Sequence, residues 1–174
     1  MMRIIAGAFA ALLLLASPVW AQSLGDQINT AASDNPGTDL PAAVDPEGFT
    51  ADMQALIVAQ YNAANPDSQV TSIEAINDTD LASTVGAMLA NNNDLSAAQA
   101  TAVVRAAIRS RPNLAVQIAS AAAYARPDIA KQIQIAAISV APANLTQQIV
   151  TATVIAAVAG VADGQATETN VSEG

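Results

Sequence analysis

Cysteine and histidine are both absent from this sequence of 174 residues. A chain without cysteine has no disulfide framework, no thiolate nucleophile and no thiol for a lipid anchor. A chain without histidine lacks the commonest metal ligand and the usual general base, which removes most catalytic triads. We therefore expect a protein that is not an enzyme and that holds no metal ion or cofactor.

Aromatic and basic residues are scarce as well. Beyond residue 21 the aromatic side chains are Phe49, Tyr61 and Tyr124, which gives few surfaces for stacking on sugars or bases. Six basic residues stand against 15 acidic ones, for a net charge of −9. A chain this acidic is repelled by nucleic acids and by anionic membranes, so we expect no nucleic-acid partner.

The segment 1–21 has the pattern of a secretory signal peptide. Arg3 precedes an apolar run, residues 4–16, and Pro18 and small residues follow up to Ala21. This run is shorter than the ~20 residues that a helix needs to cross a bilayer. We predict cleavage after Ala21 and a secreted or periplasmic bacterial protein, with no integral membrane segment left after cleavage.

Composition divides the remaining chain into three parts. Residues 22–48 mix proline, glycine, asparagine and aspartate without sustained periodicity, which predicts an acidic, weakly ordered arm. Residues 49–162 should form a helical repeat domain, and residues 163–174 should be a disordered polar tail.

The predicted domain contains a repeat. An Asp or Asn followed by Leu or Ile recurs about every 14–19 positions, at Asp80, Asp94, Asn113, Asp128 and Asn144. Each unit has room for one helix of about 12–15 residues. Connections of two or three residues force neighbouring helices to run antiparallel. We predict an all-α fold, a stack or irregular bundle of short, alanine-rich helices punctuated by proline, with a further helix over 48–64.

Two explanations of the helix starts are open. The Asp or Asn side chain can accept a hydrogen bond from a free amide of the first turn, which is worth about 1 kcal/mol. Alternatively, Pro112 and Pro127 occupy the first helical position, where the missing amide costs nothing.

Charge is unevenly distributed along the chain. Residues 22–104 carry 11 acids and no base, whereas residues 105–131 carry five bases and one acid. These five bases are the candidate partner-binding residues, Arg105, Arg109, Arg111, Arg126 and Lys131. Positive charge near helix ends also complements the helix dipole. Besides binding a partner or stabilising helix ends, these five bases can dock acidic residues, either from the 22–48 arm or from another chain.

Residues 132–162 contain no charge at all. Their most apolar stretch, 149–162, is shorter than the ~20 residues that span a bilayer. It also lacks the Lys or Arg that interfacial helices usually carry. We expect this stretch to be buried or to associate with another copy, although its run IVTATVI (149–155) also fits a strand.

Carboxylates are the main remaining candidates for catalysis and for Ca²⁺ binding. Asp78 with Asp80, and Asp45 with Glu47, lie close in sequence, but a helix cap and solvated loop acids explain them more simply. The loops 77–80 and 91–94 are rich in oxygen ligands but lack the spacing of a calcium loop. No spacing favours a catalytic pair of Lys131 with a serine.

The leading hypothesis is a non-enzymatic exported helical protein for protein–protein interaction or self-assembly. The alternative is a carrier of a small apolar ligand or a lipid-associated envelope protein, with a groove lined by Ile133, Ile138, Ile149 and Val154. An enzyme that uses carboxylates alone is the third possibility.

Export can be tested at the predicted cleavage site. N-terminal sequencing of the exported chain should begin at Gln22, because small residues precede that position as a signal peptidase requires. A chain that keeps the segment 1–21 and stays in the membrane fraction would contradict the signal-peptide assignment.

Overall fold

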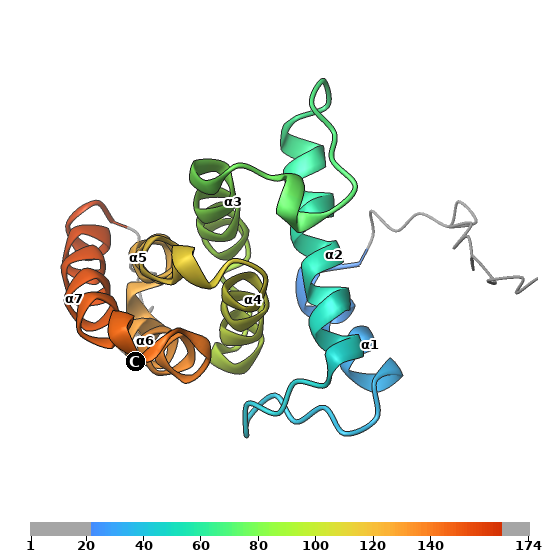
Figure 1. Ribbon diagram of the computed structural model, residues 1–174, viewed down its shortest axis with the longest axis horizontal. Helices are drawn as coiled ribbons and strands as arrows, with labels where there is room; N and C mark the ends of the chain where they lie inside the picture. The colour runs from blue at the N-terminus through green and yellow to red at the C-terminus, as the bar shows by residue number, and fades with distance from the viewer. Residues whose placement is uncertain (1–21, 165–174) are drawn as a thin grey trace, which may run out of the picture.

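The computed structural model describes residues 22–164, and this part of the chain is all-α (Figure 1). Its seven α-helices are α1 (Leu24–Asp34), α2 (Glu47–Ala64), α3 (Asp78–Asn91), α4 (Ala97–Ser110), α5 (Ala115–Ala125), α6 (Ala130–Val140) and α7 (Thr146–Ala162). Short 3-10 turns precede α3, α5, α6 and α7 at Ile73–Ala75, Pro112–Leu114, Pro127–Ile129 and Ala143–Leu145. The predicted fold class is confirmed. The predicted signal peptide, 1–21, and residues 165–174 of the predicted tail lie outside the described residues.

The helices form two rows. α2, α4 and α6 pack side by side in one row, and α3, α5 and α7 in the other. In Figure 1 the rows run from α1 and α2 on the right to α7 on the left. Helices this short bury too little surface to be stable alone. One shared hydrophobic core therefore extends through the whole stack, from Ile28 in α1 to Ile149 in α7.

Proline sets the start of α5 and α6. Pro112 and Pro127 are the first residues of the 3-10 turns that lead into these helices. The turns close when the amides of Leu114 and Ile129 donate to the carbonyls of Arg111 and Arg126, at 2.9 and 3.2 Å. The fixed φ of proline suits this position, and its missing amide leaves no unsatisfied donor. Of the two open explanations, the proline one is confirmed here.

The other open explanation, in which the Asp and Asn side chains of the repeat cap the helices, is wrong. Asn113, Asp128 and Asn144 lie inside 3-10 turns, and none of these turns has a side-chain cap. At α3 the cap is Asn77, which accepts from the Asp80 amide at 2.9 Å. At α4 the cap is Ser96, which forms a reciprocal pair of hydrogen bonds with Gln99. Both caps precede the helix by one residue, where a polar side chain reaches the free amides.

Segment 22–48, predicted to be weakly ordered, contains the helix α1. Ser23 caps it by accepting from the Asp26 amide at 3.1 Å, and Ile28 is fully buried. Gln99 on α4 donates to the Gly25 carbonyl at 3.1 Å and to Asn29 Oδ1 at 3.0 Å. The sequence pattern missed α1 because tertiary contacts from α4, distant in the sequence, hold a short and mostly polar helix in place.

Small residues allow the helices to approach one another closely. A Cβ added at Gly160 of α7 would lie 2.2 Å from the Tyr124 carbonyl oxygen of α5, so the two backbones are in direct contact there. At Gly86 of α3 the same addition would meet Ala121 at 3.4 Å, an ordinary van der Waals distance. The pair of α5 and α7 is therefore the tighter of the two packings.

These two glycines give a matched test of the packing. Gly160→Ala should lower the free energy of unfolding by about 1–3 kcal/mol, because overpacking forces the α5 and α7 backbones apart. Gly86→Ala should leave it unchanged or raise it by up to about 1 kcal/mol, since alanine favours the helix and has room. Urea unfolding followed by circular dichroism measures both. Equal effects of the two changes would contradict the close approach at Gly160.

Candidate interaction sites

Two of the predicted partner-binding arginines bind an acid of the same chain. Arg105, on α4, donates through Nε to one oxygen of Asp45 and through Nη2 to the other, at 2.7 Å for the second contact. Arg109, one turn later, donates to Asp45 Oδ2 at 2.8 Å and to Thr50 Oγ1 at 3.2 Å. The side chains of Asp45 and Arg105 are 1% and 2% exposed. Arg105 and Arg109 therefore dock an acid from segment 22–48, which is one of the three roles considered for the basic residues.

The electrostatics of this cluster favour an ionised Asp45. Burial alone raises the pKa of its carboxyl group. The hydrogen bonds and charge of Arg105, with a smaller contribution from Arg109, outweigh burial, so the pKa lies below its ordinary value of 3.8. The loop between α1 and α2 is thereby fixed on α4. We call Asp45, Arg105 and Arg109 the arginine cluster.

Arg111 and Arg126 also make contacts within the chain. Arg111 donates to a carboxylate oxygen of Asp78 and to the Glu74 carbonyl, the latter at 2.9 Å. Arg126, which is 5% exposed, donates to both oxygens of Asp128 at 2.9 Å and to the Leu95 carbonyl at 3.2 Å. The hydrogen bonds from Arg126 lower the pKa of Asp128.

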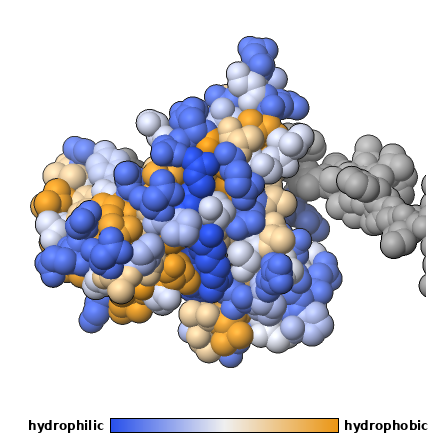
Figure 2. Space-filling view, in the orientation of Figure 1, coloured by the Kyte–Doolittle hydropathy of each residue, from blue (hydrophilic) through white to orange (hydrophobic). Residues whose placement is uncertain are grey.

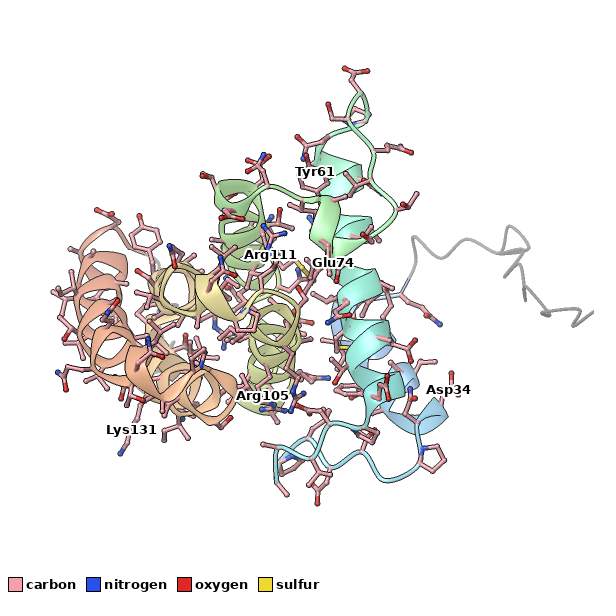
Figure 3. All side chains as sticks on the ribbon, viewed as in Figure 1. Asp34, Tyr61, Glu74, Arg105, Arg111 and Lys131 are labelled. Carbon is pink, nitrogen blue, oxygen red and sulfur yellow. The ribbon has the colours of Figure 1, made fainter. Side chains whose placement is uncertain are left out.

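Lys131 differs from the four arginines. It is the one basic residue of the described chain that takes part in no ion pair, and it projects outward from α6 (Figure 3). The five predicted binding residues are therefore not brought together in one patch. Their role in binding a partner stays a prediction, with Lys131 as the most accessible of them.

Helix α7 carries an exposed apolar surface. Its inner side is buried at Ile149, Thr153, Ala156 and Gly160. Its outer side exposes Val154, Ile155, Val158 and Val161, at 55, 65, 67 and 57%. We call these four side chains the α7 face. Figure 2 shows strongly hydrophilic residues along the seam between α2 and α4, while hydrophobic residues reach the surface around α5, α6 and α7.

A groove of about 350 Å³ runs beside the α7 face, between α6 and α7. Ala130, Lys131 and Gln134 line it from α6, and Val154, Ala157 and Val158 line it from α7. Gln134 donates to Thr153 Oγ1 at 2.9 Å, which bridges the two helices at the bottom of the groove. The groove and the α7 face thus form one continuous, mainly apolar end of the stack.

Helix α7 has 17 residues, more than the about 12–15 expected for each unit of the repeat. With its 3-10 turn it covers Ala143–Ala162, 20 residues, and an 18-residue stretch of this segment has a mean hydropathy of 1.6, with 22% of the stretch buried. By length and composition this is the one segment of residues 22–164 that could cross a bilayer. A helix packed on one side of a bundle, as α7 is, can have the same composition.

The predicted ligand groove is not formed. Ile133 and Ile149 are completely buried in the core, so they line no open space. A different hollow, of about 670 Å³, lies between α3, α5 and α7. Alanine, glycine and serine line most of it, and Tyr124 stands at its edge, donating through its hydroxyl group to Asp163 at 2.7 Å.

Three of the four candidate catalytic carboxylates have structural contacts, and the fourth, Glu47, is exposed. Asp78 binds Arg111, Asp80 accepts from Asn77 at 2.6 Å, and Asp45 belongs to the arginine cluster. Within residues 22–164 no three acidic side chains gather in a way that could hold a metal ion. Ser139 donates to the Ala136 carbonyl and lies about 12 Å along the α6 axis from Lys131.

Comparisons of the chain with protein-family models, with curated proteins and with solved structures found no match.

Sequence reasoning missed the partner of Arg105 and the exposed side of α7. Asp45 stands in the sequence as one of several acids, and only its burial distinguishes it. The outer side of α7 was hidden because apolar residues surround the whole helix, so its pattern has no polar stripe to mark the solvent side.

The arginine cluster predicts a large and pH-dependent contribution to stability. Asp45→Asn should lower the free energy of unfolding by about 3–5 kcal/mol near neutral pH, because Arg105 stays buried without its counter-ion. The folded-state pKa of Asp45 is lowered, so its contribution is present above the ordinary value of 3.8 and is lost as the pH falls through the folded-state pKa.

Urea unfolding between pH 7 and pH 2.5 measures this contribution. The free energies of unfolding of the wild type and Asp45→Asn should converge at acidic pH, because the carboxyl group of Asp45 is then protonated. Asp94→Asn is the matched control, because Asp94 is exposed in a turn. This substitution should change the free energy of unfolding by less than about 0.5 kcal/mol. A difference between Asp45→Asn and wild type that does not change with pH would contradict the ionised cluster.

Proposed function

We propose that this chain is a non-enzymatic, exported helical protein that acts by protein–protein contact through the α7 face. The observation that carries the proposal is the exposure of four Val and Ile side chains, each more than half exposed, on one side of one helix. Contiguous exposed apolar surface on a soluble protein is typical of an interaction site. The uncharged segment 132–162 adds no charge that a partner would have to desolvate.

The charged residues support a contact function more than a chemical one. Arg105, Arg109 and Arg111 bind acids of preceding segments, and Arg126 binds Asp128, two residues later in the chain. Such pairing stabilises a fold and occupies the guanidinium groups of these four arginines. A rigid scaffold that ends in an apolar surface is suited to docking.

A second candidate function is the carriage of a small apolar ligand. The hollow between α3, α5 and α7 favours it, because its lining is mainly apolar and has the volume of a small-molecule site. Native mass spectrometry of the chain recovered after export would show a bound molecule. A measured mass equal to that of the polypeptide alone, together with no binding of a fatty acid or other apolar probe, would contradict this second candidate.

Site-specific photo-crosslinking in the exporting cell tests the contact function. A photoreactive amino acid at Val158 should give crosslinks to protein, because this side chain is 67% exposed at the centre of the α7 face. The same amino acid at Ala55, an exposed position of α2, is the matched control. Crosslinks at 158 no more abundant than those at 55 would contradict the proposed function. Mass spectrometry of the products identifies the contacted chain.

A further inference from the structure

The two ends of the helix stack differ. Inside the stack each helix has neighbours on both sides within its row, as α4 has α2 and α6, and α5 has α3 and α7. The end formed by α6 and α7 has no such neighbour among residues 22–164, and its outward side chains are the α7 face and the groove beside it. This end is built like an inner layer of the stack that lacks its next helix.

The opposite end is closed by α1. Ile28 of α1 is fully buried, and Gln99 of α4 hydrogen-bonds to Gly25 and Asn29. The outward positions of α2 include Glu47 and Asp52, both exposed. An exposed apolar helix would gain little by packing against this polar, acidic end. A head-to-tail contact between copies, which would give open filaments, is therefore disfavoured.

We infer that the α6–α7 end is a two-fold interface between two copies of this chain, in which α7 packs against α7 of the second copy. This inference rests on the proposed function and names its partner. A two-fold interface brings one surface against itself, so the surface must be complementary to itself. The α7 face meets this requirement because it carries no charge, and two identical uncharged surfaces do not repel each other.

The groove adds shape to the same interface. Ala157 leaves a hollow between Val154, Val158 and the side chains of α6, into which a valine of the second copy can insert. Lys131 at the rim can extend its ammonium group into water while its methylene groups cover the contact. The surface therefore contains protrusions and a matching depression side by side.

A lipid bilayer fits this end less well than a second copy. Helices that lie in a membrane interface usually carry Lys or Arg on their polar face, and α7 contains neither. Exposed polar residues, Gln147, Gln148 and Thr151, occupy the first half of the helix. The net charge of −9 adds repulsion from anionic lipids.

The size of the surface predicts a reversible dimer. Stable complexes use about 20–30 residues on each partner, whereas the α7 face consists of four exposed side chains beside one groove. We therefore expect a dissociation constant in the micromolar range. Sedimentation velocity of the exported chain, from about 1 μM to about 500 μM, should show a shift from the mass of one chain to that of two.

A matched pair of substitutions tests the location of the interface. Val158→Asp should raise the dissociation constant at least about tenfold, because it places two carboxylates at the centre of the contact. Ile135→Asp is the control, since Ile135 is 58% exposed on the side of α6 that faces α4 and the loop at 40–43. Val154→Asp provides a second variant, and circular dichroism checks that all of them fold. Equal weakening by Val158→Asp and Ile135→Asp, or a monomer at every concentration, overturns the inference.

Cysteine crosslinking tests the two-fold symmetry, because the native chain has no cysteine. Val158→Cys should form a disulfide-linked dimer rapidly under mild oxidation, whereas Ile135→Cys should not. A Val158→Cys chain that stays monomeric, or that binds neutral phosphatidylcholine vesicles as a monomer, overturns the inference. Photo-crosslinks from position 158 to a different protein alone would overturn it while leaving the proposed function intact. Absence of any protein crosslink would contradict both.

Discussion

The close approach of short helices at small residues is the constraint on which this structure depends. A helix of 11 residues such as α5 cannot bury enough surface by itself, so it must contact neighbours on several sides. Its buried positions are mostly alanine, at 115, 119, 122, 123 and 125, which lets α3, α4, α6 and α7 all come near. At Gly160 even a methyl group would be too large. The two-row arrangement follows from this crowding around α5.

Close packing of alanine provides many small contacts but little that fixes the ends of the stack. Hydrogen bonds and ion pairs of the arginines supply this function. Asp45 ties the loop before α2 to α4, and Arg126 ties the start of α6 to the carbonyl of Leu95 before α4. The uneven charge along the sequence, with acids first and bases in the middle, thus becomes contacts of Arg105, Arg109 and Arg111 with acids 33 to 64 residues earlier, while Arg126 pairs with Asp128 two residues later. Because the pairs are internal, they leave the bundle with an acidic surface.

The fold was predictable from the sequence to the extent that local chemistry determines it. Proline at 112 and 127 stops one helix and starts the next whatever surrounds it, so the repeat and its turns could be found. The actual caps, Asn77 and Ser96, were missed because neither belongs to the repeated phrase. The helix α1 was missed because it depends on Gln99. The site was less predictable still, since burial of Asp45 and exposure of Val158 are properties of the assembled stack.

The outer side of α7 requires an explanation that folding does not provide. Val and Ile are each about 0.5 kcal/mol less favourable in a helix than alanine, because branching at Cβ restricts their rotamers. At positions 154, 155, 158 and 161 no core contact compensates this cost, since more than half of each side chain lies outside the bundle. Solubility would favour charged residues at the last helix of a stack. The proposed contact with another surface would account for four β-branched residues there, because their rigid shapes can pack without loss of further rotamer freedom.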